Sequence, residues 1–335
     1  MLLDARKTAI LRKVVTEHIE TGQPVGSAHV VRDPSIEVSP ATVRADMSAL
    51  ERDGYLSHPH TSAGRVPTDL GYRYFVDHLG VEMALDRVRE ERVEEFFART
   101  HGELERLLKD TSQLLSDLTE QTAVVVGPSP EILVVRAASL IRLAPRVALV
   151  VIVLSNGVVD KHVVELSEET SDADVAEASG ALAAQLIGDT LGSLRDFHDV
   201  GIPAVDELLA RCLLLLTEPA KPAMDGGVYV GGTARMAEQF VAVDTVRALL
   251  SILEQSFVVV SLLSDVLSLG QSVAIGTENR EASLSECSLV VANYEVDDEV
   301  VGTIGVLGPT RMNYPQALAA VAVVSQHLGN QLSKG

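Results

Sequence analysis

Apolar residues recur at helical spacing from the start of the chain. Within residues 4–20, one apolar face passes through Ile10, Val14 and Ile19, with basic residues on the other faces. Gly22 then interrupts the pattern, as glycines at helix ends commonly do. This periodicity predicts a first amphipathic helix.

Two further helices follow, and each has a capping residue at its predicted start. Ser27 is the expected N-cap of a short helix over residues 28–32. Ser39 precedes Pro40, and a serine N-cap followed by proline at the first helical position is a strong start signal. The second of these helices is expected to continue to Leu50.

The helix that begins at Pro40 has two distinct faces. Val43, Met47 and Leu50 are spaced i, i+4 and i+7, which predicts that they face a core. The opposite, outward face is expected to carry small, polar and basic side chains: Ala41, Thr42, Arg44, Ala45 and Ser48.

A β-loop and a fourth helix complete the first 80 residues. Residues 55–66 have short extended ends around a polar middle that contains proline and glycine, which predicts two strands joined by a loop. Pro67 introduces the next helix. Three helices followed by a β-loop indicate a winged helix-turn-helix over residues 1–80, whose second paired helix enters the major groove of DNA.

The predicted DNA contacts follow from side-chain chemistry. Arg44 can form bidentate bonds to guanine, and Thr42 can touch a thymine methyl group or a phosphate. Ser39 and the free N–H groups beside it suit a phosphate. Arg65 is expected to reach the DNA backbone or minor groove from the wing. The full predicted DNA-binding set is Ser27, Ser39, Ala41, Thr42, Arg44, Ala45, Ser48, His60 and Arg65.

The remainder of the chain mixes helices and strands. Residues 82–120 are expected to be a helical connector. Strands are predicted at 138–143, 147–155, 158–166, 229–233, 272–275, 288–294 and 301–307, with Asn156-Gly157 as a hairpin turn. Helices are predicted within 172–217, 237–268 and 314–332. The order indicates an α+β multidomain protein in which one domain is inserted into an α/β sensor-like domain.

The charge of the chain is unevenly distributed. The net charge is −20, from 27 basic and 47 acidic residues. Residues 1–80 contain nine basic and ten acidic residues, which leaves 18 and 37 for the rest. A near-neutral head can bind DNA locally, whereas the acidic body discourages non-specific binding.

Composition excludes several other classes of protein. A content of 47% hydrophobic residues is inconsistent with a mainly disordered chain. No apolar stretch approaches the roughly 18 to 20 residues of a membrane span, and the N-terminus lacks an apolar signal core, so a cytoplasmic protein is expected. Cys212 and Cys287 are too far apart in the chain for a disulfide framework or a metal site.

No catalytic motif stands out. The sequence has no P-loop ending, nucleophile elbow or His-Glu-x-x-His pattern, so neither an enzyme nor a cofactor is expected. His58 and His60 have no nearby cysteine or acidic partner in the wing, which disfavours a metal site. The glycine-rich stretch 302–315 indicates either tight strand packing or a small-molecule pocket, and Tyr229-Val-Gly-Gly-Thr233 indicates a plain turn.

Several motifs carry a resemblance to a known family. They are Ser39-Pro-Ala-Thr-Val-Arg44, Pro59 to Arg73, Val228 to Thr233, Ile275-Gly-Thr-Glu-Asn279 and Gly305 to Tyr314. In this order, and across essentially the whole chain, they resemble the HrcA family of heat-inducible transcription repressors.

The resemblance implies both an architecture and a function. It implies a winged-helix domain (1–80), a GAF-like domain with the helical connector (81–160 and 270–335) and a mostly helical, inserted dimerisation domain (161–269). It also implies a homodimer that binds an inverted-repeat operator and represses GroE- and DnaK-type chaperone operons. A GroEL-type chaperonin is the implied partner that keeps the repressor active.

One residue departs from the family pattern. Members commonly have Asn after the arginine of the recognition helix, whereas this chain has Ala45. Asn can bond adenine twice and Ala cannot, a difference of about 1 to 3 kcal/mol in base discrimination. Three alternatives therefore stay open: a paralogue with a different operator, a winged-helix repressor controlled by a small molecule, and a chaperonin client or adaptor without DNA binding.

Overall fold

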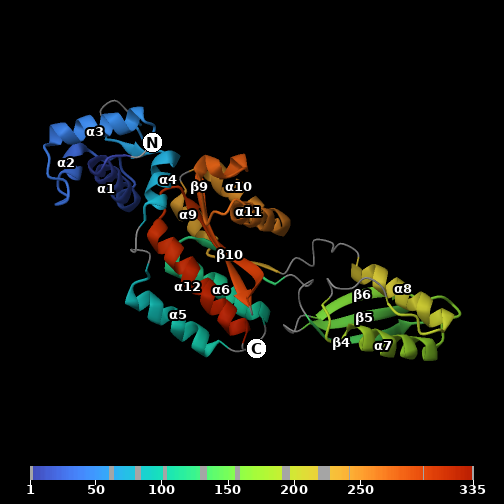
Figure 1. The fold of residues 1–335 in the computed structure, drawn as a ribbon. Helices are drawn as coiled ribbons and strands as arrows, with labels where there is room; N and C mark the ends of the chain where they lie inside the picture. Colours follow the sequence, from blue (N-terminus) through green and yellow to red (C-terminus); the bar gives the residue numbers. More distant parts are fainter. Residues whose placement is uncertain are drawn as a thin grey trace.

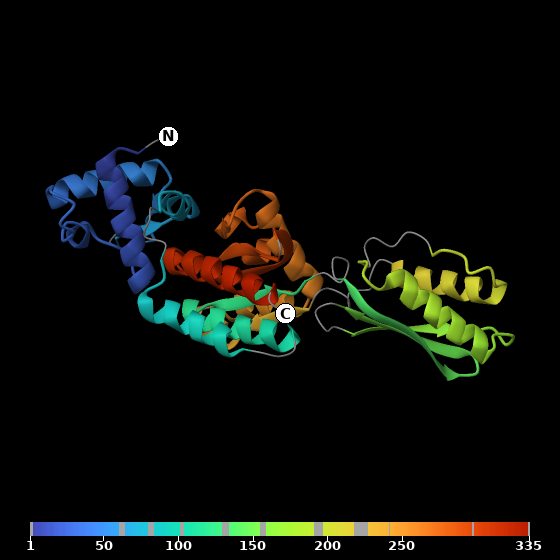
Figure 2. The same cartoon turned by 60° about the horizontal axis from the view of Figure 1, so that its bottom comes forward.

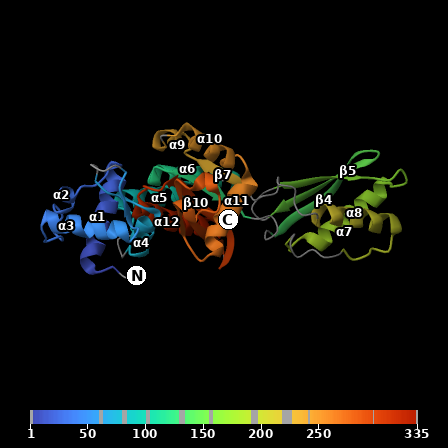
Figure 3. The same ribbon diagram turned by 90° about the horizontal axis from the view of Figure 1, so that it is seen from above.

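The chain forms three units in a row (Figures 1, 2 and 3). A computed structural model describes residues 3–59, 64–79, 84–100, 104–128, 134–154, 159–190, 197–217, 227–240, 242–296 and 298–333. We call the described residues up to 79 the head. Residues 84–128 and 227–333 form the central unit, and residues 134–217 form the insert. The mixture of helices with three separate sheets confirms an α+β multidomain protein.

The head consists of four helices and a two-stranded sheet. Its elements are α1 (Ala5–Thr21), α2 (Ser27–Val30), α3 (Pro40–Arg52), β1 (Leu56–Ser57), β2 (Val66–Pro67) and α4 (Asp69–Asp77). Strands β1 and β2 pair antiparallel. The predicted inward residues of α3, Val43, Met47 and Leu50, are buried against Ile10 and Val14 of α1.

Two predicted helix starts have different outcomes. The Ser39 hydroxyl accepts a hydrogen bond from the Thr42 N–H, and Pro40 is the first residue of α3, as predicted. The prediction that Ser27 caps α2 was wrong. Gly26 occupies the N-cap position in an extended conformation, no side chain caps the helix, and Ser27 is already helical.

The central unit has a five-stranded antiparallel sheet in the order β7-β3-β10-β9-β8. The strands are β3 (Thr122–Val126), β7 (Val228–Gly231), β8 (Val273–Ile275), β9 (Cys287–Val296) and β10 (Glu299–Pro309). Two short 3-10 helices, η3 (Gly276–Glu278) and η4 (Ala282–Leu284), follow β8.

Helices cover both faces of this sheet (Figure 1). One face packs on α6 (Leu104–Thr119) and α12 (Tyr314–Leu332), and α5 (Arg87–Arg99) packs on α12. The other packs on α9 (Ala234–Gln239), α10 (Val243–Leu253) and α11 (Ser256–Ser268). Alternation along β3 explains the two cores, because Ala123 and Val125 join the first and Val124 joins the second.

The glycine pair at the end of β7, Gly231 and Gly232, serves packing. A Cβ at Gly231 would lie 2.4 Å from the Ser112 carbonyl oxygen of α6. Gly232 has a φ of +73°, and a Cβ there would meet the Ser116 hydroxyl. Only glycine permits this close approach of β7 to α6. The Tyr229–Thr233 motif is therefore the end of a strand followed by a turn, as predicted from the strand pattern.

Helices α10 and α11 are apolar, and part of their apolar surface packs on the sheet. Leu249, Val259 and Leu263 are buried against it. Together the two helices have the length and composition of a membrane span, but they are bent by 95°. Within the described residues, no single helix is long and apolar enough to cross a membrane.

The insert has a sheet and a core of its own. Strands β4 (Val135–Ala144), β5 (Val147–Leu154) and β6 (Val159–Glu165) pair antiparallel in that order. Helices α7 (Asp172–Leu186) and α8 (Pro203–Thr217) cover one face, where Val150, Ile152 and Leu182 are buried. The predicted turn Asn156-Gly157 lies outside the described residues, but the strands on either side of it pair as expected.

The observed pairing corrects the expected place of the inserted segment. Residues up to 160 were expected to join the C-terminal strands, and a mostly helical insert was expected to begin at 161. Instead β4 and β5 pair with β6 and share its core. The separate unit therefore consists of a three-stranded sheet and two helices, and is not mostly helical. Helices α9 to α11, expected within 161–269, pack on the central sheet. Hydrophobic periodicity locates strands but does not identify their partners.

The head and the central unit share one continuous hydrophobic core. The ring of Tyr72 in α4 lies 5.8 Å from that of Tyr314, the first residue of α12. The Tyr72 hydroxyl is 2.7 Å from His18 Nδ1 of α1. Burial lowers the pKa of His18, and the nearby charge of Arg311 lowers it further. The imidazole is therefore held neutral at this junction.

Acidification should weaken the folded state through His18. The unfolded chain binds a proton at this histidine near its ordinary pKa of about 6.5, whereas the folded chain binds it only at lower pH. Because the unfolded state then holds more protons, the free energy of unfolding should fall as pH drops below about 6.5. Urea unfolding of the wild type and of His18→Gln at pH 7.5 and 5.5 measures this. Equal losses in both proteins would contradict it.

Candidate nucleic-acid interface

The outer face of α3 is accessible, as the sequence predicts. Ala41, Arg44 and Ala45 are exposed, and Thr42 and Ser48 are half-buried. Arg44 forms no ion pair with any residue that the structure describes. Its guanidinium is therefore available for an external anion or base edge.

The hydroxyl groups on this helix are already hydrogen-bonded. The Ser39 hydroxyl lies 3.0 Å from that of Thr42, in addition to capping the helix. The Ser48 hydroxyl donates to the Arg44 carbonyl oxygen at 3.0 Å. Ser27 is half-buried in the first turn of α2. Of these polar side chains, that of Arg44 has the most unused donor capacity.

A charged pair holds the inner face of α3. Arg6 Nε donates to Asp46 Oδ2 at 2.8 Å, and Arg6 Nη2 lies 3.3 Å from Asp46 Oδ1. Asp46 is 7% exposed, and its hydrogen bond raises the pKa of Arg6. The pair connects α3 to α1. The pair was not predicted, although an acidic residue between Val43 and Met47 on the apolar face of α3 was a signal for it.

The ends of β1 and β2, the two strands of the predicted wing, meet in a polar cluster with the end of α3. Glu51 Oε2 lies 2.8 Å from Arg65 Nε, and Glu51 Oε1 lies 3.2 Å from His58 Nδ1. Arg65 Nη1 is 2.7 Å from His58 Nε2. The Arg65 side chain is only 15% exposed. Its guanidinium thus serves an internal contact that the sequence analysis did not predict. His60 lies outside the described residues.

The backbone of Arg65 also anchors the wing. Its N–H and carbonyl oxygen both bond to Val25, at 2.9 and 2.8 Å. The neighbouring Gly64 runs so close that a Cβ would lie 2.4 Å from the Val25 carbonyl oxygen. The wing is therefore joined to the segment between α1 and α2, as well as to α3.

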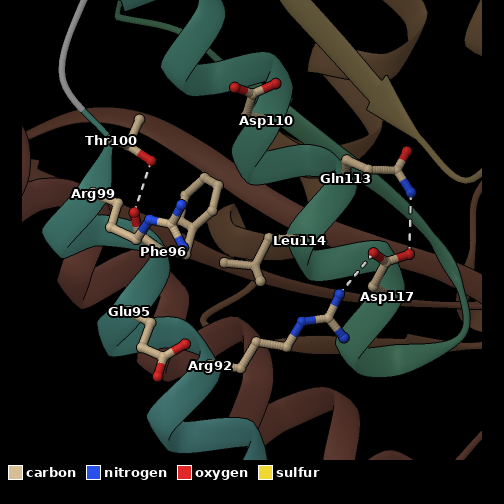
Figure 4. A pocket seen from close by; sticks show the side chains of 9 residues that line it. All are labelled: Arg92, Glu95, Phe96, Arg99, Thr100, Asp110, Gln113, Leu114 and Asp117. Carbon is tan, nitrogen blue, oxygen red and sulfur yellow. Dashed lines mark hydrogen bonds and ion pairs between the residues drawn. The ribbon is translucent and has the colours of Figure 1, made fainter.

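A cavity of about 480 Å³ lies between α5 and α6 in the central unit (Figure 4). Its lining carries charges of both signs, and two of its polar side chains, Arg92 and Gln113, are bonded to Asp117. Asp117 accepts from Arg92 at 3.0 Å, Gln113 at 3.1 Å and Arg235 at 2.8 Å. This carboxylate is already satisfied by protein donors, so the cavity does not favour a particular ligand.

The two cysteines have no role at the candidate interface. Cys212 is buried in the insert and Cys287 in the central unit, both as free thiols. Burial raises the pKa of Cys212 to about 11 and that of Cys287 to about 12. Within the described residues, no cluster of three or more histidine, cysteine or acidic side chains could hold a metal ion.

Comparisons with known proteins agree over almost the full chain. The HrcA protein C terminal domain matches residues 105–318. A heat-inducible transcription repressor HrcA of Symbiobacterium thermophilum is 36% identical, and the alignment covers 98% of both chains. The repressor of the same name from Thermobifida fusca is also 36% identical, over 99% of this chain and 98% of its own.

The chain belongs to the HrcA family. Membership supports transcription repression, under heat-inducible control, as the role of the chain. A crystal structure of a hypothetical protein has a TM-score of 0.68 and 23% identity, with 99% of each chain covered. That likeness shows the fold and nothing more.

In this HrcA family member, loss of the Arg65 side chain should loosen the pairing of β1 and β2. We expect Arg65→Ala to cost about 1 kcal/mol in local stability, because the half-buried Glu51 loses its charged partner. Arg52→Ala is the matched control, since Arg52 is exposed at the end of the same helix. Hydrogen exchange of peptides covering β1 and β2 in the full chain should accelerate in the first variant only. Equal exchange in both variants would refute the anchoring role.

Proposed function

We propose that the head is a winged helix-turn-helix that binds double-stranded DNA. The observation that carries this proposal is the two-faced α3. Its inner face is held by Asp46, Val43 and Leu50, whereas its outer face presents Arg44. A helix fixed on one side and exposed on the other suits insertion into the major groove. The wing formed by β1 and β2 follows directly.

The proposed base and phosphate contacts come from the first turns of α3. Arg44 reads a guanine, and Thr42 and Ser48 supply phosphate or methyl contacts beside Ala41 and Ala45. Arg65 acts mainly by holding the wing in position. Ala45 cannot make the paired bonds of an asparagine, so Arg44 carries a larger share of the discrimination.

The proposed biological role is repression of GroE- and DnaK-type chaperone operons through an inverted-repeat operator. The names of the relatives, heat-inducible transcription repressor, support repression under heat control. An inverted repeat requires a twofold arrangement of two heads. The protein is therefore proposed to act as a homodimer.

The open face of the insert sheet supports this dimer. Helices α7 and α8 lie on one side of the sheet (Figure 2). On the other side, Ile141, Leu149 and Val163 form a row across the three strands. Ile141 is 48% and Val163 is 61% exposed. No described segment of the chain covers this apolar row.

A second copy of the chain is the proposed occupant of that face. In a twofold dimer the two rows would lie against each other, which buries apolar surface of the same chemistry on both sides. The insert lies at the opposite end of the molecule from the head (Figures 1 and 2). Pairing there leaves both heads free to reach adjacent half-sites.

We also propose a GroEL-type chaperonin as a partner that supports repressor activity. The family resemblance implies this partner, and exposed apolar side chains on the central unit provide a surface for it. Val243 is 71%, Phe257 is 70% and Leu269 is 55% exposed, all on or beside α10 and α11. Exposed apolar groups of this kind mark interaction surfaces.

A gel shift with the chaperone-operon inverted repeat tests the proposed function. A scrambled half-site is the control, salt is held constant, and chaperonin is present or absent. Tight binding to the intact repeat alone, improved by chaperonin, is expected. No preference for the repeat would contradict operator recognition. Binding that chaperonin does not change would favour a repressor controlled by a small molecule.

Removal of the Arg44 side chain should relax base recognition. Loss of a bidentate contact costs about 1 to 3 kcal/mol, so Arg44→Ala should lower operator affinity by about 5- to 150-fold for each half-site. Non-specific affinity should change little. Arg52→Ala, at the far end of α3, should weaken binding slightly and equally for all sequences. An Arg44→Ala protein with unchanged operator affinity and an intact fold would rule out this helix as the reader.

A charge on the open sheet face should separate the dimer. We expect Val163→Lys to weaken self-association by about 100-fold or more, because each twofold interface would contain the buried charge twice. Val88→Lys is the control, since Val88 is 76% exposed on α5, away from the sheet. Sedimentation equilibrium measures both. A Val163→Lys protein that stays dimeric would move the interface elsewhere.

A further inference from the structure

The head is fastened to the central unit by two side chains one turn apart on α4. The first is Asp69. Its Oδ2 atom accepts from the Thr277 backbone N–H at 2.9 Å and from the Thr277 hydroxyl at 2.8 Å. Thr277 lies in η3, more than two hundred positions further along the chain. This carboxylate therefore connects the start of α4 to the loop that follows β8.

The second side chain is Arg73, which makes contacts on several sides. Its Nε atom donates to Glu278 Oε1 at 2.8 Å, and its Nη2 atom donates to Glu278 Oε2 as well. Nη2 also donates to the Val273 carbonyl oxygen at 2.8 Å. The side chain is only 18% exposed, and the hydrogen bonds to Glu278 raise the pKa of Arg73. A bidentate pair of this kind restricts direction as well as distance.

Glu278 is itself held in place. Its Oε2 atom accepts from the Ile275 N–H at 2.9 Å, so the carboxylate that receives Arg73 cannot swing freely. Gly276 between them has a φ of +53°, and a Cβ there would lie 2.3 Å from the Asp69 carboxylate. The η3 loop is thus shaped to receive α4 at close range.

The other side of α4 is packed equally tightly on the head. A Cβ at Gly71 would approach within 2.2 Å of the Tyr55 carbonyl oxygen, just before β1. The Thr68 hydroxyl donates to the Gly54 carbonyl oxygen at 2.6 Å. Helix α4 therefore belongs to both units, and the direction of α3 relative to the central sheet is transmitted through it (Figure 1).

We propose that Asp69, Arg73 and Glu278 are positioning residues that set the distance and rotation between the two DNA half-sites the dimer accepts. This inference rests on the proposed function. In the proposed dimer, a head seated in one orientation on its central unit can meet fewer half-site spacings than a loosely attached head. Heads attached by a flexible connection would accept several spacings. At each spacing, however, the second head would have a lower effective concentration at its half-site once the first head is bound.

The proposal also accounts for motifs that DNA contacts leave unexplained. The stretches Thr68 to Arg73, Ile275 to Asn279 and Arg311 to Tyr314 are remote in sequence. In the structure they meet at this junction, with Tyr72 against Tyr314 and Asp69 against Thr277. None of them lies on the outer face of α3.

A panel of operators with altered spacing tests the inference. The half-sites are kept, and the spacer is lengthened or shortened by one, two and three base pairs. Each base pair that is added or removed rotates one half-site relative to the other by about 34°. A single half-site and a scrambled repeat complete the panel. Binding of the wild type, Arg73→Gln and Glu278→Gln is measured at constant salt. Arg87→Gln is the matched control, because it removes an ion pair of the same 2.8 Å length on the exposed surface of α5.

The wild type and the control should lose at least about 10-fold in affinity for every altered spacer. In Arg73→Gln and Glu278→Gln, affinity for the best spacing should fall by about 10-fold, and the altered spacers should differ from it by less than about 3-fold. Affinity for a single half-site, and the dimer mass, should be unchanged.

Two results would overturn the inference. In one, Arg73→Gln and Glu278→Gln bind every operator more weakly by the same factor, so that their dependence on spacer length equals that of the wild type. That result would mean that the ion pair only stabilises the fold. The other is a wild-type protein that binds the repeat equally at every spacing. A wild-type protein that does not distinguish the repeat from the scrambled DNA would instead refute the proposed function.

Discussion

The close contact between α4 and the η3 loop is the constraint on which the arrangement of the molecule depends. The bidentate Arg73–Glu278 pair gives it direction, and the Asp69 carboxylate gives it a second point of attachment. Beside these polar contacts, Tyr72 and Tyr314 join the hydrophobic core of the head to that of the central unit. Polar geometry and apolar burial thus act at the same interface, so the head is seated as part of a shared core.

Within the head, the same logic applies to α3. Burial of Val43 and Leu50 fixes the distance of the helix from α1, and the Arg6–Asp46 pair fixes its rotation. Apolar contacts tolerate sliding more readily than a hydrogen-bonded charge pair does. The exposed guanidinium of Arg44 is therefore presented from a helix whose position and rotation are both determined.

Much of this fold could be predicted where the signal is local. The start of α3 at Pro40 and the whole of α12 follow from capping residues and periodicity within a few positions. The Ser27 cap failed because Gly26, one residue earlier, takes the extended conformation that a cap requires. The membership of β4 and β5 was missed because pairing is decided by packing between distant segments. The role of Arg65 was missed for a similar reason, since Glu51 lies in another element.

The uneven charge of the chain gives the rigid junction its importance. Outside the first 80 residues, the chain has 37 acidic residues and only 18 basic ones. Such a body repels phosphate and provides little of the sequence-independent attraction on which many DNA-binding proteins rely. In the proposed dimer, affinity must then come from specific contacts made by two heads at once. Simultaneous contact depends steeply on geometry, because a misplaced second head contributes no binding energy. In an acidic protein with a near-neutral head, the accuracy with which α4 is seated therefore affects affinity as directly as the residues of α3 do.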